Sequence, residues 1–436
     1  MLDIEKLNAN YKKDPTNELM ENLLSKMSII DSLKTKEGLN NEIFNIDLPT
    51  HGVTDQKGTG ACWIYSFLNY LRELVIYKTD MKTNFALSAN YLTYYDKLEK
   101  LNYIMDKLVL YNGNKGKEDE TRYILSSGIF DGANFNQLAQ LIDKYGLVPS
   151  GVYHETVNSL DTDEINAVLN RVLGVFYLEL LKGKNPEKLK EKHLQAAYNI
   201  LTFTYGEMPT KFDFKYKDNQ GNINLYKEMT PQSFYESLEI DILNSYVEVT
   251  AVKGDDKNKI EFGKYYEIKD SSLVKSGTNV RYLNLPINRV KRLMVKQLLE
   301  CEPVCFNSLM IPYFEEGNWK DIYKIMDQKY GRFLSEDINK PYKLELKRDD
   351  IRKSHSIIHG HSMLLTGASD YEGKGKVNLW KVENSWGPGI GFDGYFTLED
   401  DFMTKYLLSA IINKDFLSKN EQEIVNKRPQ IRKKWN

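Results

Sequence analysis

Apolar residues recur every three or four positions along much of the first half of the chain, and this spacing predicts helices with a buried face. The clearest case is the segment 62–77. Its apolar face consists of Ile64, Phe67, Leu68, Leu71, Leu74 and Val75. Further helices are predicted over 87–111, where Ser88 can cap the start, and over 286–301, where Pro286 stands near the first turn.

The second half of the chain changes to a strand-like pattern. Over 212–285, aromatic and β-branched residues alternate with polar ones between Gly and Asp turns, most clearly in 241–252 and 262–268. Four later segments are interpreted as buried or paired strands. They are 303–310, 361–371, 376–386 and 394–399. Helices followed by strands predict an α+β protein with a helical lobe and a sheet lobe.

The same patterns suggest four parts for the chain of 436 residues. We predict an N-terminal arm and helical lobe over 1–155, a charged and mostly helical insertion over 156–230, a sheet lobe over 231–418, and a basic C-terminal arm over 419–436. The first 45 residues are polar and helix-prone. Their apolar positions in helical register are Leu19, Leu23, Leu24 and Met27.

Composition and charge exclude several classes of protein. Hydrophobic residues make up 41% and aromatic residues 12% of the chain, which is typical of a globular protein with a sizeable core. The formal net charge is −2, so no global basic field would hold nucleic acid or an anionic membrane. No apolar run approaches the roughly 20 residues of a membrane span, and the first residues lack the apolar core of a secretory signal. Three cysteines are too few for a disulfide framework, which favours a reducing cytoplasm.

One of those cysteines, Cys62, stands where the first strong helix is predicted to begin, in the segment QKGTGACW. A thiol at a helix N-terminus meets unpaired backbone N–H groups that favour the thiolate. Gly58 and Gly60 allow a tight turn before it, and Gln56 offers an amide N–H donor. A backbone N–H and one amide side chain can together form an oxyanion hole. The alternative is that Cys62 is a small buried hydrophobic residue, as most free cysteines are.

A thiolate nucleophile needs a proton donor and acceptor, and His361 is the best candidate among the six histidines. It stands at the start of the apolar strand HSMLLTGAS, so it is expected at the end of the sheet. Its imidazole then needs an orienting partner. Asn384 follows a predicted strand in the segment WKVENSWG, and Trp386 can cover it from water.

These three segments, in this order, resemble the signature of papain-type cysteine peptidases. The resemblance implies Gln56 as oxyanion donor, Cys62 as nucleophile, His361 as general acid and base, and Asn384 as the residue that orients His361. Gly60, Trp63 and Trp386 would support them. It also implies a papain-like two-lobe fold, with a helical lobe, a β-barrel-like sheet lobe and large helical insertions. No metal or organic cofactor is implied.

The spacing of the motifs resembles one branch of the family. Cys62 and His361 are 299 positions apart, about twice the roughly 130–150 residues usual in papain-type enzymes. This excess, with further similar segments over about residues 5–418, resembles the bleomycin hydrolase and aminopeptidase C branch. The branch implies a cytoplasmic homohexameric ring that removes residues from peptides with free N-termini.

Among the departures from the family pattern, those at Thr59 and in the C-terminal arm bear on function. Thr59 stands where other papain relatives have a disulfide cysteine, which fits a reducing compartment. The C-terminal arm, which in the branch lies in the active-site cleft, is basic here and ends at Trp435 and Asn436. A shorter arm would leave the cleft open to endopeptidase action or to the removal of more than one residue. The alternative is a solvated tail with no effect on specificity.

Two other kinds of function remain as alternatives. His355 and His359 have the i, i+4 spacing of some zinc ligands, with His361 nearby, but no Glu lies between them and Gly360 interrupts a helix. The other alternative is a non-catalytic ring that binds peptides or nucleic acid. Negative net charge argues against nucleic acid, and an inactive relative would have lost one of the four catalytic residues. Replacing Cys62 by Ser separates a peptidase from a binding protein.

Overall fold

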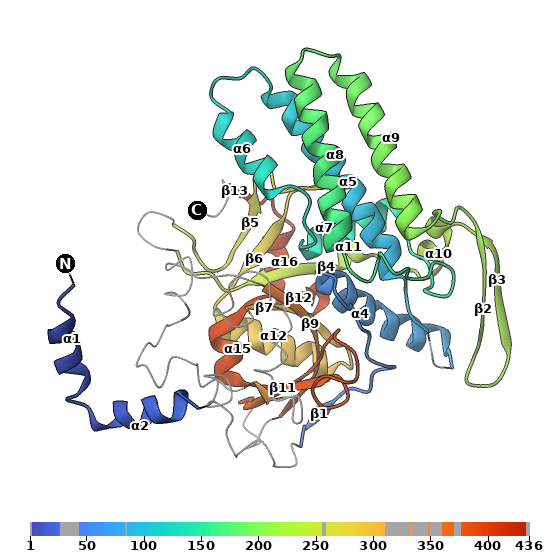
Figure 1. Cartoon of the computed structure of the whole chain (residues 1–436). Helices are drawn as coiled ribbons and strands as arrows, with labels where there is room; N and C mark the ends of the chain where they lie inside the picture. The colour runs from blue at the N-terminus through green and yellow to red at the C-terminus, as the bar shows by residue number, and fades with distance from the viewer. Residues whose placement is uncertain are drawn as a thin grey trace.

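The structure is a computed structural model, and it describes residues 2–26, 43–82, 85–254, 259–309, 332–333, 348, 360–369 and 376–432. Figure 1 shows long helices packed together on one side of the molecule and a large sheet on the other. The α+β class predicted from the sequence is confirmed.

The helical side is formed mainly by six helices that follow one another along the chain. They are α4 (Cys62–Thr79), α5 (Ala89–Tyr111), α6 (Glu118–Ser127), α7 (Phe135–Tyr145), α8 (Asp163–Leu181) and α9 (Pro186–Tyr205). Their starts agree with local sequence signals, because Ser88 accepts a hydrogen bond from the Tyr91 N–H at 3.2 Å and Asn134 caps α7 in the same way. Helix α4 ends at Asp80, whose φ of 49° is left-handed.

In the described parts of the chain the sheet side contains eleven strands, in the order β13-β5-β6-β4-β12-β7-β9-β10-β11-β8 with β1 paired to β9. Their bounds are β1 (Ile46–Asp47), β4 (Tyr246–Thr250), β5 (Lys264–Ile268), β6 (Arg281–Asn284), β7 (Val304–Leu309), β8 (Arg332–Phe333), β9 (Gly360–Ser369), β10 (Leu379–Glu383), β11 (Tyr395–Glu399), β12 (Leu407–Asn413) and β13 (Gln430–Arg432). Strand β9 is central, and its near-continuous apolar run agrees with burial on both faces.

The remaining elements are short helices and one hairpin. They are α1 (Ile4–Tyr11), α2 (Pro15–Leu24), the hairpin β2 (Phe212–Lys217) and β3 (Ile223–Met229), α10 (Pro231–Ser237), α11 (Ile242–Ser245), α12 (Ile287–Leu299), α15 (Asp400–Tyr406), the 3-10 helix Lys414–Phe416 and α16 (Lys419–Val425). The prediction of a strand over 241–252 is therefore wrong in its first part, because Asp241 caps a helical turn before β4 begins, and right for β4 itself.

Two hydrophobic cores lie on opposite faces of the sheet. One lies among the helices and extends to Cys305, Leu364 and Ile411 on the sheet. The other lies on the opposite face of the sheet, beneath α12 and α15. Helix α4 packs on β9 and β7, so it is buried between the helical core and the sheet. This position brings the start of α4 to the first residues of β9.

The N-terminal helices α1 and α2 bury no residues and lie apart from the two cores in Figure 1. Leu19 and Leu23, predicted in helical register, lie on α2 and are exposed, while Met27 lies outside the described residues. Among the described helices, none is long and apolar enough to cross a membrane.

Candidate active site

Cys62 is the first residue of α4, and its side chain is partly exposed. Ala61 at the N-cap offers no side-chain hydrogen bond, so the first N–H groups of the helix stay available to an anion. Within the described residues, the first turn of α4 contains no acidic residue that would oppose a thiolate. The thiol predicted from the sequence therefore lies where a helix terminus stabilises negative charge.

The sheet brings the two other predicted polar residues together. His361 lies at the start of β9, and Asn384 follows directly after β10, the neighbouring antiparallel strand. His361 Nε2 lies 2.8 Å from Asn384 Oδ1, and both side chains are buried. Trp386 stacks on the His361 ring with centroids 4.7 Å apart, so it shields this hydrogen bond from water. The second ring nitrogen, Nδ1, is left for Cys62.

Cys62 and His361 shift each other's proton affinity. Burial raises the pKa of Cys62, but the nearby His361 charge and hydrogen bonds from His361 and Ser362 outweigh it, so the pKa is lowered. Burial lowers the pKa of His361, yet Cys62 and Asn384 raise it above its ordinary value. Both shifts favour a thiolate and imidazolium pair. Ser362, which contributes to this balance, was not singled out in the sequence.

Gln56 lies on the loop before Cys62 and is buried. Its Nε2 donates to the Thr59 carbonyl at 2.6 Å, and its Oε1 accepts from the Ser385 hydroxyl at 2.6 Å. These bonds fix the amide plane between the loop and the segment that carries Asn384. One of the two amide hydrogens is used by Thr59, which leaves the other for a further acceptor.

The loop before Cys62 is tied to a second loop by Asp131, which the sequence did not suggest. The Gly60 N–H donates to Asp131 Oδ2 at 3.0 Å, and Trp63 Nε1 donates to the Asp131 carbonyl at 2.9 Å. A Cβ at position 60 would lie 2.7 Å from the Asp131 Cβ, so this close approach requires Gly60. Lys97, on α5, lies 2.7 Å from the same carboxylate and holds its pKa well below the usual range despite burial.

A second buried ion pair supports the Asn384 side. Arg72, nearly three turns along α4 from Cys62, donates to Glu383 Oε1 at 3.2 Å, and Asn69 donates to the same oxygen at 2.9 Å. Glu383 is the last residue of β10 and precedes Asn384. One helix therefore carries the thiol at its start and fastens the strand that delivers Asn384.

Several predicted positions fall outside the described residues. His355 and His359, the alternative zinc ligands, are among them, as are Trp435 and Asn436 at the end of the arm. Within the described part of the chain, no group of three or more His, Cys, Asp or Glu side chains could hold a metal ion. The arm is described as far as Arg432, where β13 pairs in parallel with β5 and Arg432 donates to the Lys259 carbonyl at 2.7 Å.

Comparisons with known proteins agree with these motifs. The profile of the Peptidase C1-like family matches residues 1–436. Aminopeptidase C of Streptococcus thermophilus is 31% identical, covering 99% of this chain and 96% of the relative. Aminopeptidase G of Lactobacillus delbrueckii subsp. lactis is 30% identical, covering 99% and 97%. The crystal structure of PepW from Lactobacillus rhamnosis HN001 superimposes with a TM-score of 0.87 at 27% identity, covering 99% of this chain and 97% of that one.

Proposed function

The chain belongs to the Peptidase C1-like family and has a papain-like fold, and from this premise we propose that its cysteine-type aminopeptidase activity proceeds through an acyl-enzyme on Cys62. The relatives named aminopeptidase C and aminopeptidase G, matched over nearly their whole length, give the activity class and confirm the aminopeptidase C branch predicted from the sequence. The substrates are peptides, and the residue removed carries the free N-terminus.

The proposed acylation step uses the coupled pair and the helix terminus. The Cys62 thiolate attacks the scissile carbonyl carbon, and a bond forms between Sγ and that carbon. The resulting oxyanion accepts hydrogen bonds from the Cys62 backbone N–H and the free amide N–H of Gln56. The His361 imidazolium then donates its Nδ1 proton to the leaving amine as the C–N bond breaks. A thioester of the N-terminal residue remains on Cys62.

In deacylation the proton transfer runs in the opposite direction, from water to His361. Neutral His361 takes a proton from water, the hydroxide oxygen bonds to the thioester carbon, and the thiolate leaves. The amino acid departs and the thiolate and imidazolium pair is restored. Asn384 keeps the imidazole in one orientation and tautomer through both steps, and Trp386 keeps water from competing for that hydrogen bond. The chain needs only a reduced thiol for this cycle.

The observation that carries the proposal is the mutual stabilisation of Cys62 and His361, with His361 held 2.8 Å from Asn384. The test is cleavage of fluorogenic peptides under reducing conditions, with free and acetyl-blocked N-termini and with Cys62→Ser as control. We expect cleavage of the free-amine series only, and none by the variant. Cleavage of the acetyl-blocked peptides would indicate endopeptidase activity instead. Equal behaviour of Cys62→Ser and the unmodified protein would refute the mechanism.

We also propose that the enzyme works in the cytoplasm as a homohexamer, as the family branch implies. A reducing compartment keeps the nucleophile active, and Cys62, Cys301 and Cys305 are all free thiols. Sedimentation analysis of the purified protein tests the assembly, and a mass of one or two chains would contradict it. Activity recovered in the soluble cytoplasmic fraction, and lost in oxidising buffer, tests the location.

A further inference from the structure

A buried carboxylate that has no cationic partner among the described residues is linked by hydrogen bonds to the catalytic pair. Glu248, on β4, is 3% exposed. Its oxygens accept hydrogen bonds from Ser409 at 2.6 Å, Asn307 at 3.4 Å and Asn136 at 3.4 Å, all of which are neutral side chains. Burial raises the pKa of Glu248 to about 7. A buried carboxylate ordinarily has a cationic partner, so this one is able to bind another cation.

The other carboxylates that support the active site are already neutralised. Three of them belong to ion pairs on the elements next to Cys62 and Asn384. These pairs are Asp55 with Lys57 at 2.5 Å, Asp131 with Lys97 at 2.7 Å and Glu383 with Arg72 at 3.2 Å. Within the described parts of the chain, no Lys, Arg or His lies within ion-pair distance of Glu248. Glu248 therefore differs from them in having only neutral donors.

Two side chains connect Glu248 to the nucleophile. Asn307 on β7 donates to Glu248 and accepts a hydrogen bond from the Ser362 hydroxyl. Ser362 follows His361 on β9, and its hydrogen bonds help to lower the pKa of Cys62. Ser362 and Asn307 are directly paired across β9 and β7, and Asn307 is half-buried. The carboxylate is therefore linked to Cys62 through two hydrogen-bonded side chains, Asn307 and Ser362.

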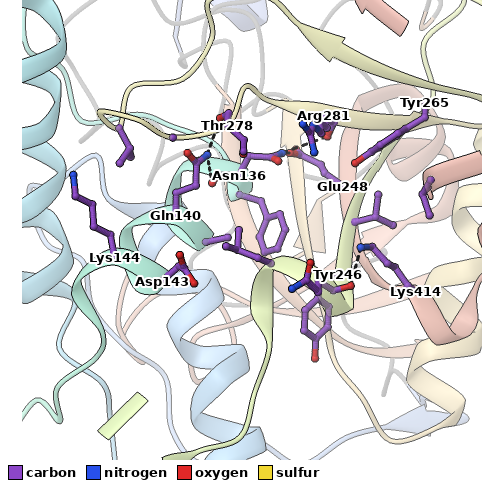
Figure 2. Close-up of a pocket in the computed structure, with 18 of the residues that line it drawn as sticks. Asn136, Gln140, Asp143, Lys144, Tyr246, Glu248, Tyr265, Thr278, Arg281 and Lys414 are labelled. Atoms are coloured by element: carbon purple, nitrogen blue, oxygen red, sulfur yellow. Dashed lines mark hydrogen bonds between the residues drawn. The ribbon is translucent and has the colours of Figure 1, made fainter. Parts of the chain in front are cut away.

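A cavity gives Glu248 room on its other side. It has a volume of about 730 Å³, and Figure 2 shows Glu248 and Asn136 next to each other on its wall. Four basic side chains also line it, but each already has another partner. Lys144 pairs with Glu99 at 2.5 Å, Arg281 with Glu267 at 2.9 Å and Lys275 with Asp106 at 3.6 Å, and Lys414 donates to the Asn244 carbonyl at 2.7 Å. These cations leave the Glu248 carboxylate unpaired.

We propose that Glu248, with Asn307 and Ser409, forms an acidic subsite that binds a positive charge on the N-terminal residue of the substrate. This inference rests on the proposed aminopeptidase function. The charge is either the α-ammonium group, which every substrate with a free N-terminus carries, or the side chain of an N-terminal Lys or Arg. In both cases the cationic group of the substrate supplies the partner that the buried Glu248 carboxylate lacks. A hydrogen bond between two charged groups is stronger than one between neutral groups.

The experiment compares Glu248→Gln with the unmodified enzyme at pH 8, where the carboxyl is ionised. One arm measures kcat/KM for lysyl and norleucyl fluorogenic amides, which differ in the side-chain charge. The other arm measures inhibition by leucinal and by 4-methylpentanal, which differ in the α-amine. Glu302→Gln is the control, because Glu302 is a partly buried carboxylate that also accepts hydrogen bonds from neutral side chains, those of Tyr70 on α4 and Asn413. The rate of Cys62 alkylation by uncharged iodoacetamide measures the fraction of Cys62 that is thiolate, independently of any substrate charge.

Two ratios are compared: kcat/KM for the lysyl over the norleucyl amide, and inhibition by leucinal over inhibition by 4-methylpentanal. We expect Glu248→Gln to reduce at least one of them by about tenfold. The rate of Cys62 alkylation, and both ratios in Glu302→Gln, should stay unchanged. The affected ratio identifies the source of the charge. Unchanged ratios in both arms would overturn the proposal. A parallel loss on all ligands together with slower alkylation would also overturn it, because Glu248 would then only position Ser362. Failure of the unmodified enzyme to cleave any amide would instead refute the proposed function.

Discussion

Removing the Asp131 carboxylate tests how the nucleophile loop is held in place. In Asp131→Ala, the Lys97 ammonium, which is fully buried, loses the anion 2.7 Å away. Asn166 Oδ1 remains as its hydrogen-bond partner. The Gly60 N–H loses its acceptor at the same time. The substitution therefore leaves an uncompensated charge in the core and releases the loop next to Cys62.

The structure sets the size of each effect. Breaking a buried ion pair by removing one partner costs about 3–5 kcal/mol, and because Asn166 stays in place we expect about 3 kcal/mol of lost stability. Replacing both charges by apolar groups is often neutral, so Asp131→Ala with Lys97→Met should recover most of the loss. The Gly60 N–H stays unpaired in the double variant. Its kcat/KM should therefore stay reduced, on the order of tenfold, because the loop is no longer fixed.

The assay is guanidinium unfolding under reducing conditions, combined with kcat/KM on a leucyl amide. Glu261→Ala is the control, because its ion pair with Lys264 lies at the surface and its loss should leave the free energy of unfolding unchanged. The reasoning is refuted if the double variant recovers activity together with stability. It is also refuted if Asp131→Ala is as stable as the unmodified protein.

Three further predictions follow from the site. Iodoacetamide should modify Cys62 at lower pH than the exposed Cys301, because the lowered pKa keeps Cys62 ionised as pH falls. Mass spectrometry of the labelled peptides over pH 5–9 measures this, and the same pH profile for both cysteines would contradict it. Asn384→Ala should lower kcat more than it raises KM in steady-state assays, because His361 loses its orientation and not its contact with substrate. Arg72→Met should lower the free energy of unfolding by about 3 kcal/mol, because the buried Glu383 keeps neutral donors such as Asn69 but loses its cationic partner, which Glu73 loses as well. Thermal unfolding measures this loss, and Arg72→Met/Glu383→Gln should recover part of it.

The sequence predicts the elements that bury one apolar face and the residues that follow a family motif. Helix α4 and strand β9 are examples, since their apolar spacing and their positions relative to Cys62 and His361 agree with the structure. The change from α15 to β12 was not predicted, because no Gly or Pro separates helix from strand between residues 400 and 413.

The supporting charges could not be predicted for a different reason. Lys97 and Lys100 lie in a helical segment where charged residues normally face water, yet both are fully buried. Their partner Asp131 comes from a loop about thirty residues later. Glu248 likewise meets Asn307 only through strand pairing within the folded sheet. Contacts between distant segments depend on the tertiary fold, and periodicity within one segment carries no information on them.

The separation of the proposed catalytic residues along the chain has a consequence for the synthesis of the protein. Cys62 is translated 299 residues before His361, and Asn384 comes later still. At about 5–20 residues per second, a ribosome needs roughly 15–60 s to cover that interval. During this time the thiol has neither its proton acceptor nor the sheet on which α4 packs. Hydrolysis therefore begins only after most of the polypeptide has been made, and the newly made chain is spared its own peptidase activity while it is still unfolded.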